Sequence, residues 1–297
     1  LYQMDFSKMI EAHKNSGAAL TIATIPVSER EAPEFGILKS NQDQVITSFV
    51  EKPKKEILSD WVSDTGALMQ SQGRNYLASM GIYVFNKEIL HQFLNEVHPN
   101  ATDFGKEIIP DSISNYKVLS YQHEGYWTDI GNIYSFFEAN ISLTDEMPQF
   151  NLFDSTQTVY TRSRMLPPAK ISGTQIQNAI VAEGSIIHAA SITKSVIGIR
   201  SRIGKDTVIK NAYIMGCDFY ETINQINQKI DKGQPVLGIG ERCVIEDAIV
   251  DKNCSIGNDV QIKGGPNLEK IDHPLYTVKD GIVVIKKGAV IPNGFII

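Results

Sequence analysis

The sequence has few cysteines and no clustered metal ligands. Its three cysteines, Cys217, Cys243 and Cys254, include no C-x-x-C pair, and its six histidines show no metal-ligand spacing. Disulfide frameworks and zinc sites both need paired or clustered residues of these types. We therefore expect free thiols in a reducing compartment, which favours a cytoplasmic location.

Long apolar runs and an excess of positive charge are also missing. No segment approaches the roughly 20 apolar residues that a membrane-spanning helix needs, and Lys286 and Lys287 interrupt the apolar stretch near the C-terminus. The net charge is −6, from 34 acidic and 28 basic side chains. An acidic chain repels a phosphate backbone, so we expect neither a membrane nor a nucleic acid as a partner. Small anions are compatible with this charge because they need only a few well-placed cations.

The sequence pattern changes along the 297 residues, a length that suits two domains of medium size. Residues 1–150 mix helical and strand periodicity, which predicts an α/β domain. Strands are predicted at 19–27, 44–50 and 78–85, and helices at 88–97 and 133–143. The periodicity lapses over residues 151–175, where Pro167 and Pro168 indicate a linker.

In residues 176–297 an isoleucine or valine recurs at every sixth position. The runs are Ile180, Ile186, Ile192; Ile197, Ile203, Ile209; Val244, Val250, Ile256, Ile262; and Ile285, Ile291, Ile297. A six-residue step does not keep to one face of an α-helix, but it fits one short strand and one corner per side of a triangular parallel β-helix. The alternative is a β-sandwich with coincidental spacing. Residues 216–238 interrupt the pattern, which predicts a protruding loop with a helical turn.

Three short motifs in the first half carry charges suited to a sugar phosphate; they are Phe49–Pro53, Asp103–Lys106 and Gly125–Gly131. The ammonium group of Lys52 is a flexible point donor to phosphate oxygens. Asp129 lies in a glycine-flanked aromatic segment, where its carboxylate could bind Mg²⁺, which prefers oxygen ligands. Both have structural alternatives, because Lys52 could be a charged strand end and Asp129 could cap a helix beginning near Asn132.

These motifs resemble those of glucose-1-phosphate adenylyltransferase (ADP-glucose pyrophosphorylase), particularly its cyanobacterial and plant branch. The resemblance extends over nearly the whole chain and includes Ala32–Gly36, Ser79–Phe85, Leu166–Pro168 and Gly198–Arg202. It implies a Rossmann-like nucleotidyltransferase domain followed by a left-handed parallel β-helix of hexapeptide repeats. The implied reaction converts ATP and α-D-glucose 1-phosphate to ADP-glucose and pyrophosphate, with Mg²⁺ as cofactor, in glycogen or starch biosynthesis.

The same resemblance assigns roles to individual residues. Lys52 and Asp129 are the implied catalytic residues, with Asp129 as the metal ligand, and we expect the two to converge on a phosphorylated hexose in one cleft. The implied substrate-binding residues are Gly36, Glu51, Lys52, Ser79, Tyr83, Asp103, Phe104 and Trp127. Hydroxyl and carboxylate groups beside aromatic walls suit a hexose. Each residue singly also fits an ordinary role, such as a strand end, core packing or a helix cap.

A second site is implied on the β-helix. The cations Arg200, Arg202, Lys252 and Lys287 match residues that bind a phosphorylated allosteric effector or phosphate in relatives. Four cations within reach of one another would repel without an anion, which is a physical reason to expect one. The alternative is a solvated basic face. Because Lys286 precedes Lys287 directly, either of the two could be the second lysine of the site. Family analogy also implies a homotetramer, and a plastid location if the source is a plant or alga.

The chain begins at Leu1, without the glycine-rich ATP-binding loop and the second acidic metal ligand that the family places ahead of this point. We therefore expect a chain that lacks its N-terminal part and is inactive alone, with an incomplete strand framework that exposes a sheet edge. One alternative is a non-catalytic regulatory subunit of the same enzyme. Another is a GDP-mannose-type pyrophosphorylase that uses GTP and mannose 1-phosphate.

Overall fold

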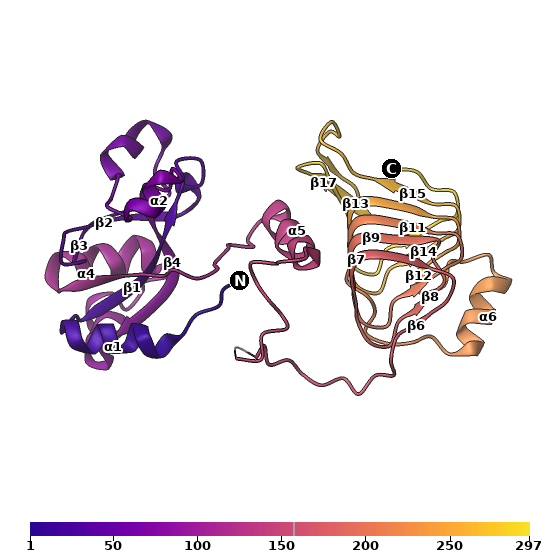
Figure 1. Ribbon diagram of the computed structural model, residues 1–297, viewed down its shortest axis with the longest axis horizontal. Helices are drawn as coiled ribbons and strands as arrows, with labels where there is room; N and C mark the ends of the chain where they lie inside the picture. Colours follow the sequence, from indigo (N-terminus) through magenta and orange to yellow (C-terminus); the bar gives the residue numbers. More distant parts are fainter. Residues whose placement is uncertain (157) are drawn as a thin grey trace. The chain divides into compact units, whose positions relative to one another are not determined.

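The computed structural model describes residues 1–156 and 158–297. The chain divides into an N-terminal unit, Tyr2–Trp127, and a C-terminal unit, Leu1 with Thr128–Ile297 (Figure 1). Each unit has its own apolar core. No helix in these described ranges is both long and apolar enough to cross a membrane.

The N-terminal unit is built on a five-stranded sheet in the order β3-β2-β4-β1-β5. The central strand β1 is parallel to β5, while the other neighbouring pairs are antiparallel. The strands are β1 (Leu20–Val27), β2 (Gly36–Ser40), β3 (Ile46–Glu51), β4 (Tyr76–Phe85) and β5 (Val118–Gln122). The three predicted strands are confirmed as β1, β3 and β4. Sequence periodicity missed β2 and β5, which have five residues each.

Helices pack on both faces of this sheet because successive side chains of a strand point to opposite sides. On one face Ile25 of β1 packs with Met9 of α1 (Phe6–Ser16). On the other face Ile22 packs with Ile109 of α4 (Ile109–Asn115). The remaining helical segments are η1 (Ala32–Glu34), η2 (Lys55–Trp61), α2 (Ala67–Ser71), α3 (Lys87–Gln92), η3 (Phe93–Val97) and η4 (Phe104–Ile108). The predicted helix at 88–97 is therefore found as α3 continued by the π-helical turn η3.

Strand β4 contains a bulge opposite β1. Thr24 pairs with Ser79 and Ile22 pairs with Tyr83, so three residues of β4 lie opposite one residue of β1. Gly81, at φ 71°, is within the bulge and its N–H donates to the Ser79 hydroxyl at 3.3 Å. Bulges re-aim side chains and are common beside functional sites. This one determines where Ser79 and Tyr83 point.

The C-terminal unit begins with helix α5 (Ile133–Ile141), followed by η5 (Ser142–Thr144), as predicted for 133–143. Asn132 caps the helix by accepting a hydrogen bond from the N–H of Ser135 at 2.8 Å. Phe137 of α5 packs against Ile249 and Ile282 of the β-helix. By this packing α5 belongs to the β-helix unit.

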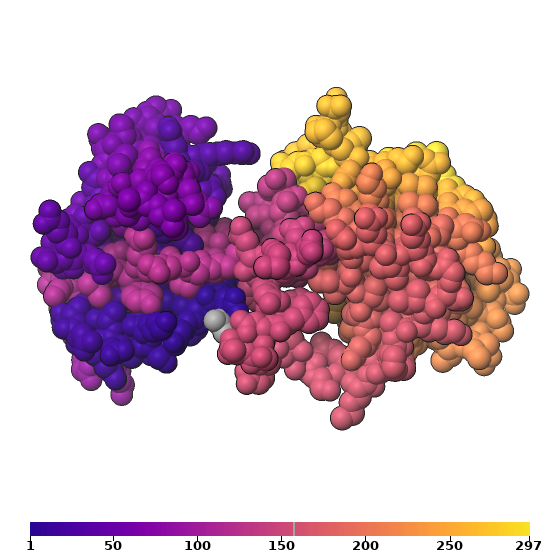
Figure 2. All heavy atoms as spheres, in the orientation of Figure 1, coloured from indigo at the N-terminus to yellow at the C-terminus, as the bar shows by residue number. Residues whose placement is uncertain are grey.

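The rest of the unit is a parallel β-helix whose coils follow one another from magenta to yellow (Figures 1 and 2). One wall consists of the two-residue strands β6 (Lys170–Ile171), β8 (Ile186–Ile187), β10 (Arg202–Ile203), β12 (Gly238–Ile239), β14 (Ser255–Ile256) and β19 (Val290–Ile291). A second wall consists of β7 (Gln175–Val181), β9 (Ser191–Ile197), β11 (Val208–Ile214), β13 (Val244–Val250) and β18 (Ile282–Ile285), with β15 (Gln261–Lys263) also paired to β13. At its end, β16 (Ile271–Asp272) and β17 (Tyr276–Lys279) extend this wall as antiparallel strands. The predicted hexapeptide solenoid is confirmed.

Isoleucines stack in register along the axis of the β-helix. Ile176, Ile192, Ile209, Ile245 and Ile262 are successive partners on adjacent strands. The four inner members are fully buried, whereas Ile176, in the first coil, is 39% exposed. The repeated six-residue step thus builds a continuous core in which each coil supports its neighbours.

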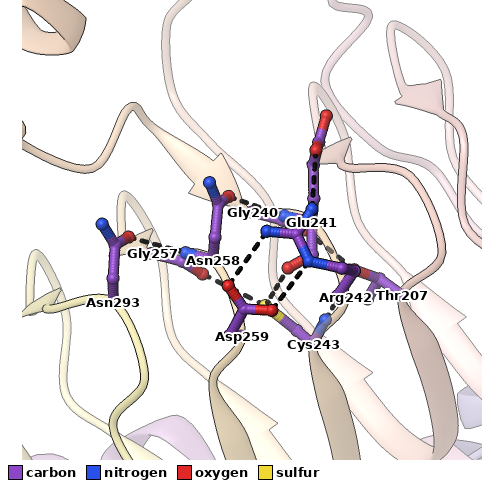
Figure 3. Close-up of polar contacts among 9 residues, drawn as sticks. All are labelled: Thr207, Gly240, Glu241, Arg242, Cys243, Gly257, Asn258, Asp259 and Asn293. Atoms are coloured by element: carbon purple, nitrogen blue, oxygen red, sulfur yellow. Dashed lines mark hydrogen bonds and ion pairs between the residues drawn. The ribbon is translucent and has the colours of Figure 1, made fainter.

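One corner of the β-helix carries a column of amide side chains (Figure 3). The side-chain oxygen of Asn293 accepts from the N–H of Asn258, and that of Asn258 accepts from the N–H of Glu241, at 2.8 and 2.9 Å. A Cβ on Gly240 would lie 2.5 Å from the Asn258 oxygen, and one on Gly257 would lie 2.7 Å from the Asn293 nitrogen. Glycine is required here because the next coil occupies the space of a side chain.

The insertion at 216–238 leaves the β-helix and carries α6 (Ile223–Asp231), which stands outside the coils (Figure 1). Thr222 and Gln225 form a capping box at its start, so the predicted helical turn is a nine-residue helix. The carboxylate of Glu221 accepts from the N–H of Leu237 at 2.7 Å and pairs with Lys229 at 2.5 Å. These contacts fasten the two ends of the insertion together.

Candidate functional site

The carboxylate of Glu51 lies in a slot between two glycines of the N-terminal unit. Glu51 ends β3 and pairs with Gly36 of β2. Its Oε2 is 2.8 Å from the position of a Cβ on Gly36 and 3.0 Å from that of a Cβ on Gly105, in η4. The side chain is half-buried, and within the described ranges its carboxylate makes no hydrogen bond or ion pair. Its oxygens are therefore available as acceptors.

Asp103 lies next to this slot and caps η4. Its Oδ1 accepts from the N–H groups of Gly105 and Lys106 at 2.8 and 3.2 Å, and lies 3.3 Å from the Cβ position of Gly105. Its Oδ2 is 3.7 Å from the Lys106 ammonium. Glu107 completes the turn by accepting from the N–H groups of Thr102 and Asp103. The cap uses one carboxylate oxygen of Asp103 and leaves the other for a further donor.

Aromatic rings form one side of this group. Tyr83 and Phe104 stack with centroids 5.8 Å apart at 14°, and Phe85 meets both rings edge-on. Burial raises the pKa of Tyr83, and the carboxylates of Glu51 and Asp103 raise it further, against a hydrogen bond from Ser79 that lowers it. Ser79, Tyr83, Glu51 and Asp103 thus lie close enough to influence one another. The structure brings together six of the predicted residues: Gly36, Glu51, Ser79, Tyr83, Asp103 and Phe104.

Trp127 is not part of this group. It packs with the cluster on the opposite face of the sheet, where its ring is 5.3 Å from that of Phe35. Tyr83 packs with the other cluster. Core packing, the ordinary role considered for Trp127, is what the structure shows.

Lys52 directly follows Glu51 and has an unusual backbone conformation. Its φ is 48°, a left-handed value that is uncommon for residues other than glycine, and its N–H donates to the carbonyl of Phe35 at 3.0 Å. The side chain is exposed and, in the described part of the chain, forms no ion pair. An exposed lysine ammonium of this kind can donate to the oxygens of a bound phosphate.

Asp129 belongs to the C-terminal unit and lies in an exposed turn. Its Oδ1 accepts from the N–H of Gly131 at 3.0 Å. Asn132, and not Asp129, caps α5, so the structure does not support the alternative that Asp129 is a helix cap. The described residues contain no group of three or more His, Cys, Asp or Glu side chains that could hold a metal. Mg²⁺ commonly takes only one or two carboxylates and completes its shell with water and substrate phosphates. The exposed carboxylate of Asp129 fits that role as a single ligand.

On the β-helix, Lys252 and Lys287 gather around Asp218. The Lys252 ammonium is 2.7 Å from Oδ1 of Asp218, and Asn253 donates to its other oxygen at 3.0 Å. The hydrogen bond from Lys252, then that from Asn253, lowers the pKa of Asp218, and Lys287 adds a smaller effect. Within the protein, Asp218 therefore supplies a negative charge to Lys252. Lys286 instead pairs with Asp272 at 2.7 Å.

Arg200 and Arg202 line a small pocket between the β-helix and the insertion, together with Phe219 and Tyr220. The Arg200 guanidinium lies 5.7 Å from the centroid of the Tyr220 ring. Neither arginine forms an ion pair with a described residue. The four predicted cations thus form two pairs with different surroundings.

Sequence reasoning missed Phe85, Gly105 and Asp218. Phe85 could have been found, because it lies two residues after Tyr83 on a strand and so shares its face. Gly105 lies inside a motif that was recognised, but a glycine has no functional group to attract notice. Nothing in the sequence pairs Asp218 with Lys252, which is 34 residues away.

Comparison with known families places each half of the chain. Residues 1–146 match the nucleotidyl transferase family, and residues 164–296 match the GLGC left-handed parallel beta-helix domain. The predicted fold class is confirmed in both parts, including the hand of the β-helix. The chain therefore combines a nucleotidyl transferase domain with a GLGC-type left-handed parallel β-helix, and is a sugar-phosphate nucleotidyltransferase by its domains.

Proposed function

We propose that this protein is a glucose-1-phosphate adenylyltransferase, which forms ADP-glucose and pyrophosphate from ATP and α-D-glucose 1-phosphate for glycogen or starch synthesis. The observation that carries the proposal is the gathering of Glu51, Tyr83 and Asp103 on one face of the N-terminal sheet, with Lys52 directly after Glu51 in the sequence. The order of the two matched domains, which is that of ADP-glucose pyrophosphorylases, supports it.

The reaction requires positioning and charge more than covalent chemistry by the protein. A phosphate oxygen of glucose 1-phosphate attacks the α-phosphorus of ATP, a new O–P bond forms, the bond to the β-phosphate oxygen breaks, and pyrophosphate leaves. Lys52 would neutralise the hexose phosphate. Glu51 and Asp103 would accept hydrogen bonds from sugar hydroxyls, while Phe104 covers the ring. Bound Mg²⁺ would neutralise phosphate charge, with Asp129 as its ligand from this chain.

The proposal includes regulation by an anion. Arg200, Arg202, Lys252 and Lys287 would bind phosphate or a phosphorylated effector in a homotetramer. Support comes from the pairing of Lys252 with Asp218, since a site that holds a carboxylate can hold another oxyanion. Binding there would alter catalysis only by favouring one of two states of the enzyme.

The direct test is calorimetric titration of the chain with glucose 1-phosphate and, separately, with mannose 1-phosphate. Lys52→Ala should weaken binding of glucose 1-phosphate about 10- to 100-fold, the value of a hydrogen bond to a charged group. Lys14→Ala, which removes an exposed lysine of α1, should leave the affinity unchanged. Equal losses in both variants would contradict the assignment of Lys52.

Two outcomes would favour the other functions. Tighter binding of mannose 1-phosphate, together with pyrophosphate release from GTP, would indicate a GDP-mannose-type pyrophosphorylase. If the chain alone binds phosphate but releases no pyrophosphate, and its addition changes the rate of pyrophosphate release by a complete subunit, it is a regulatory subunit. Release of pyrophosphate from ATP that depends on glucose 1-phosphate supports the proposal.

A further inference from the structure

The two glycines beside Glu51 are not needed for backbone conformation. Neither Gly36 nor Gly105 has a positive φ, so any residue could adopt their backbone geometry. What distinguishes both positions is lack of space, since each Cβ position lies within 3.0 Å of the Glu51 carboxylate. The absence of a side chain, and not flexibility, is therefore the property that the structure uses.

We propose that Gly105 is a positioning residue for hexose binding, which acts by leaving room for the carboxylate of Glu51. This inference rests on the proposed function. Gly36 closes the slot on one side, where an added Cβ would also lie 2.6 Å from the Phe49 ring. Gly105 closes it on the other side, where an added Cβ would contact only the Glu51 and Asp103 carboxylates closely.

The position of Glu51 depends on this slot because no bond holds it. Its carboxylate makes no hydrogen bond or ion pair with any described residue, so packing alone sets its place. A Cβ on Gly105 at 3.0 Å from Oε2 is tighter than normal contact, and the flexible Glu51 side chain is the group that would yield. Displacement of an acceptor by a fraction of an ångström weakens a hydrogen bond to a sugar hydroxyl.

A double-mutant cycle tests the inference. The variants are Gly105→Ala, Glu51→Asp and the double variant, each titrated with glucose 1-phosphate. We expect each single change to raise Kd about tenfold. The Kd of the double variant should rise by less than the product of the two single fold-changes, because the shorter aspartate side chain withdraws from the added methyl group. Effects that multiply without interaction would overturn the inference.

The matched control is Gly265→Ala. Gly265 also lacks a positive φ, and nothing lies within 4 Å of its Cβ position. This variant should bind glucose 1-phosphate like the original chain. A similar loss in Gly265→Ala would show that the effect of Gly105→Ala is general and would contradict the slot.

Thermal unfolding without ligand separates this inference from the proposed function. Gly105→Ala should lower Tm in the original chain but not in a Glu51→Ala background, where the crowded carboxylate is gone. If the chain binds no hexose phosphate but shows this coupling in Tm, the crowding of Glu51 at position 105 is supported and the proposed function is contradicted. If Gly105→Ala fails to fold in both backgrounds, or lowers Tm equally in both, the inference is overturned.

Discussion

Replacing Ile209 with alanine should destabilise the β-helix by about 3 kcal/mol. Ile209 is fully buried and lies between Ile192 and Ile245 in the isoleucine stack. Removing three carbons costs about 0.8 kcal/mol each, or about 2.4 kcal/mol. The coils above and below cannot close the gap without breaking their strand register, so a cavity adds to this and places the total within the usual range of about 2–5 kcal/mol.

The matched control is Ile176→Ala in the first coil. Ile176 makes the same kind of stacking contact with Ile192 but is 39% exposed, so its loss should cost about 1 kcal/mol. Urea unfolding followed by far-UV circular dichroism measures both losses. Trp61 and Trp127 both lie in the N-terminal unit, so tryptophan fluorescence follows that unit separately and should not change. Equal losses for the two variants would refute the cooperative stack.

Three further outcomes are expected. Burial lowers the pKa of His123, against smaller opposing effects from backbone groups of Tyr126 and Gln3. Below about pH 6.5 this histidine is therefore protonated more readily in the unfolded chain than in the folded chain. The free energy of unfolding should fall as the pH is lowered from about 7.5 to about 5.5. In a His123→Phe variant the free energy of unfolding, measured by urea titration at both pH values, should fall less between them. An equal fall in the variant and the original chain would contradict this. Asp218→Asn should tighten binding of inorganic phosphate several-fold at low salt by freeing Lys252 and Lys287, and weaker binding in calorimetry would contradict it. Burial raises the pKa of Cys254 to about 11, so at pH 8 roughly one thiol in a thousand is ionised, and iodoacetamide should alkylate it much faster in urea than in the native protein.

The sequence predicted the β-helix well because its physics is local and periodic. Most residues at the six-residue step, such as Ile203, Ile209 and Ile256, are buried in the stacked core, so the period is visible in the sequence. Ile180, Ile186 and Val244 lie outside this core, and the residue that follows each of them packs in it or against it instead. The insertion broke the period and could be located, but its helix was underestimated. The capping box of Thr222 and Gln225 is a local signal that would have predicted the full length of α6.

The candidate site was harder to predict because it depends on long-range pairing. Glu51 and Gly105 meet only because β3 lies beside β2 and η4 packs over the same face, and neither arrangement has a local pattern. Trp127 illustrates the opposite case, since an aromatic residue inside a functional motif packs on the other face of the sheet. A motif identifies a segment, whereas the face to which each side chain points depends on the register of the strands.

The column of Asn258 and Asn293 has a consequence for how the β-helix tolerates changes in length. Each amide bonds to the coil directly beside it, so one residue added within a wall would shift every later side chain out of its stack. A long addition at a corner leaves the stack intact, as the segment at 216–238 already demonstrates, because Glu221 joins its two ends. Corners are therefore the places where foreign peptides can be grafted into this protein.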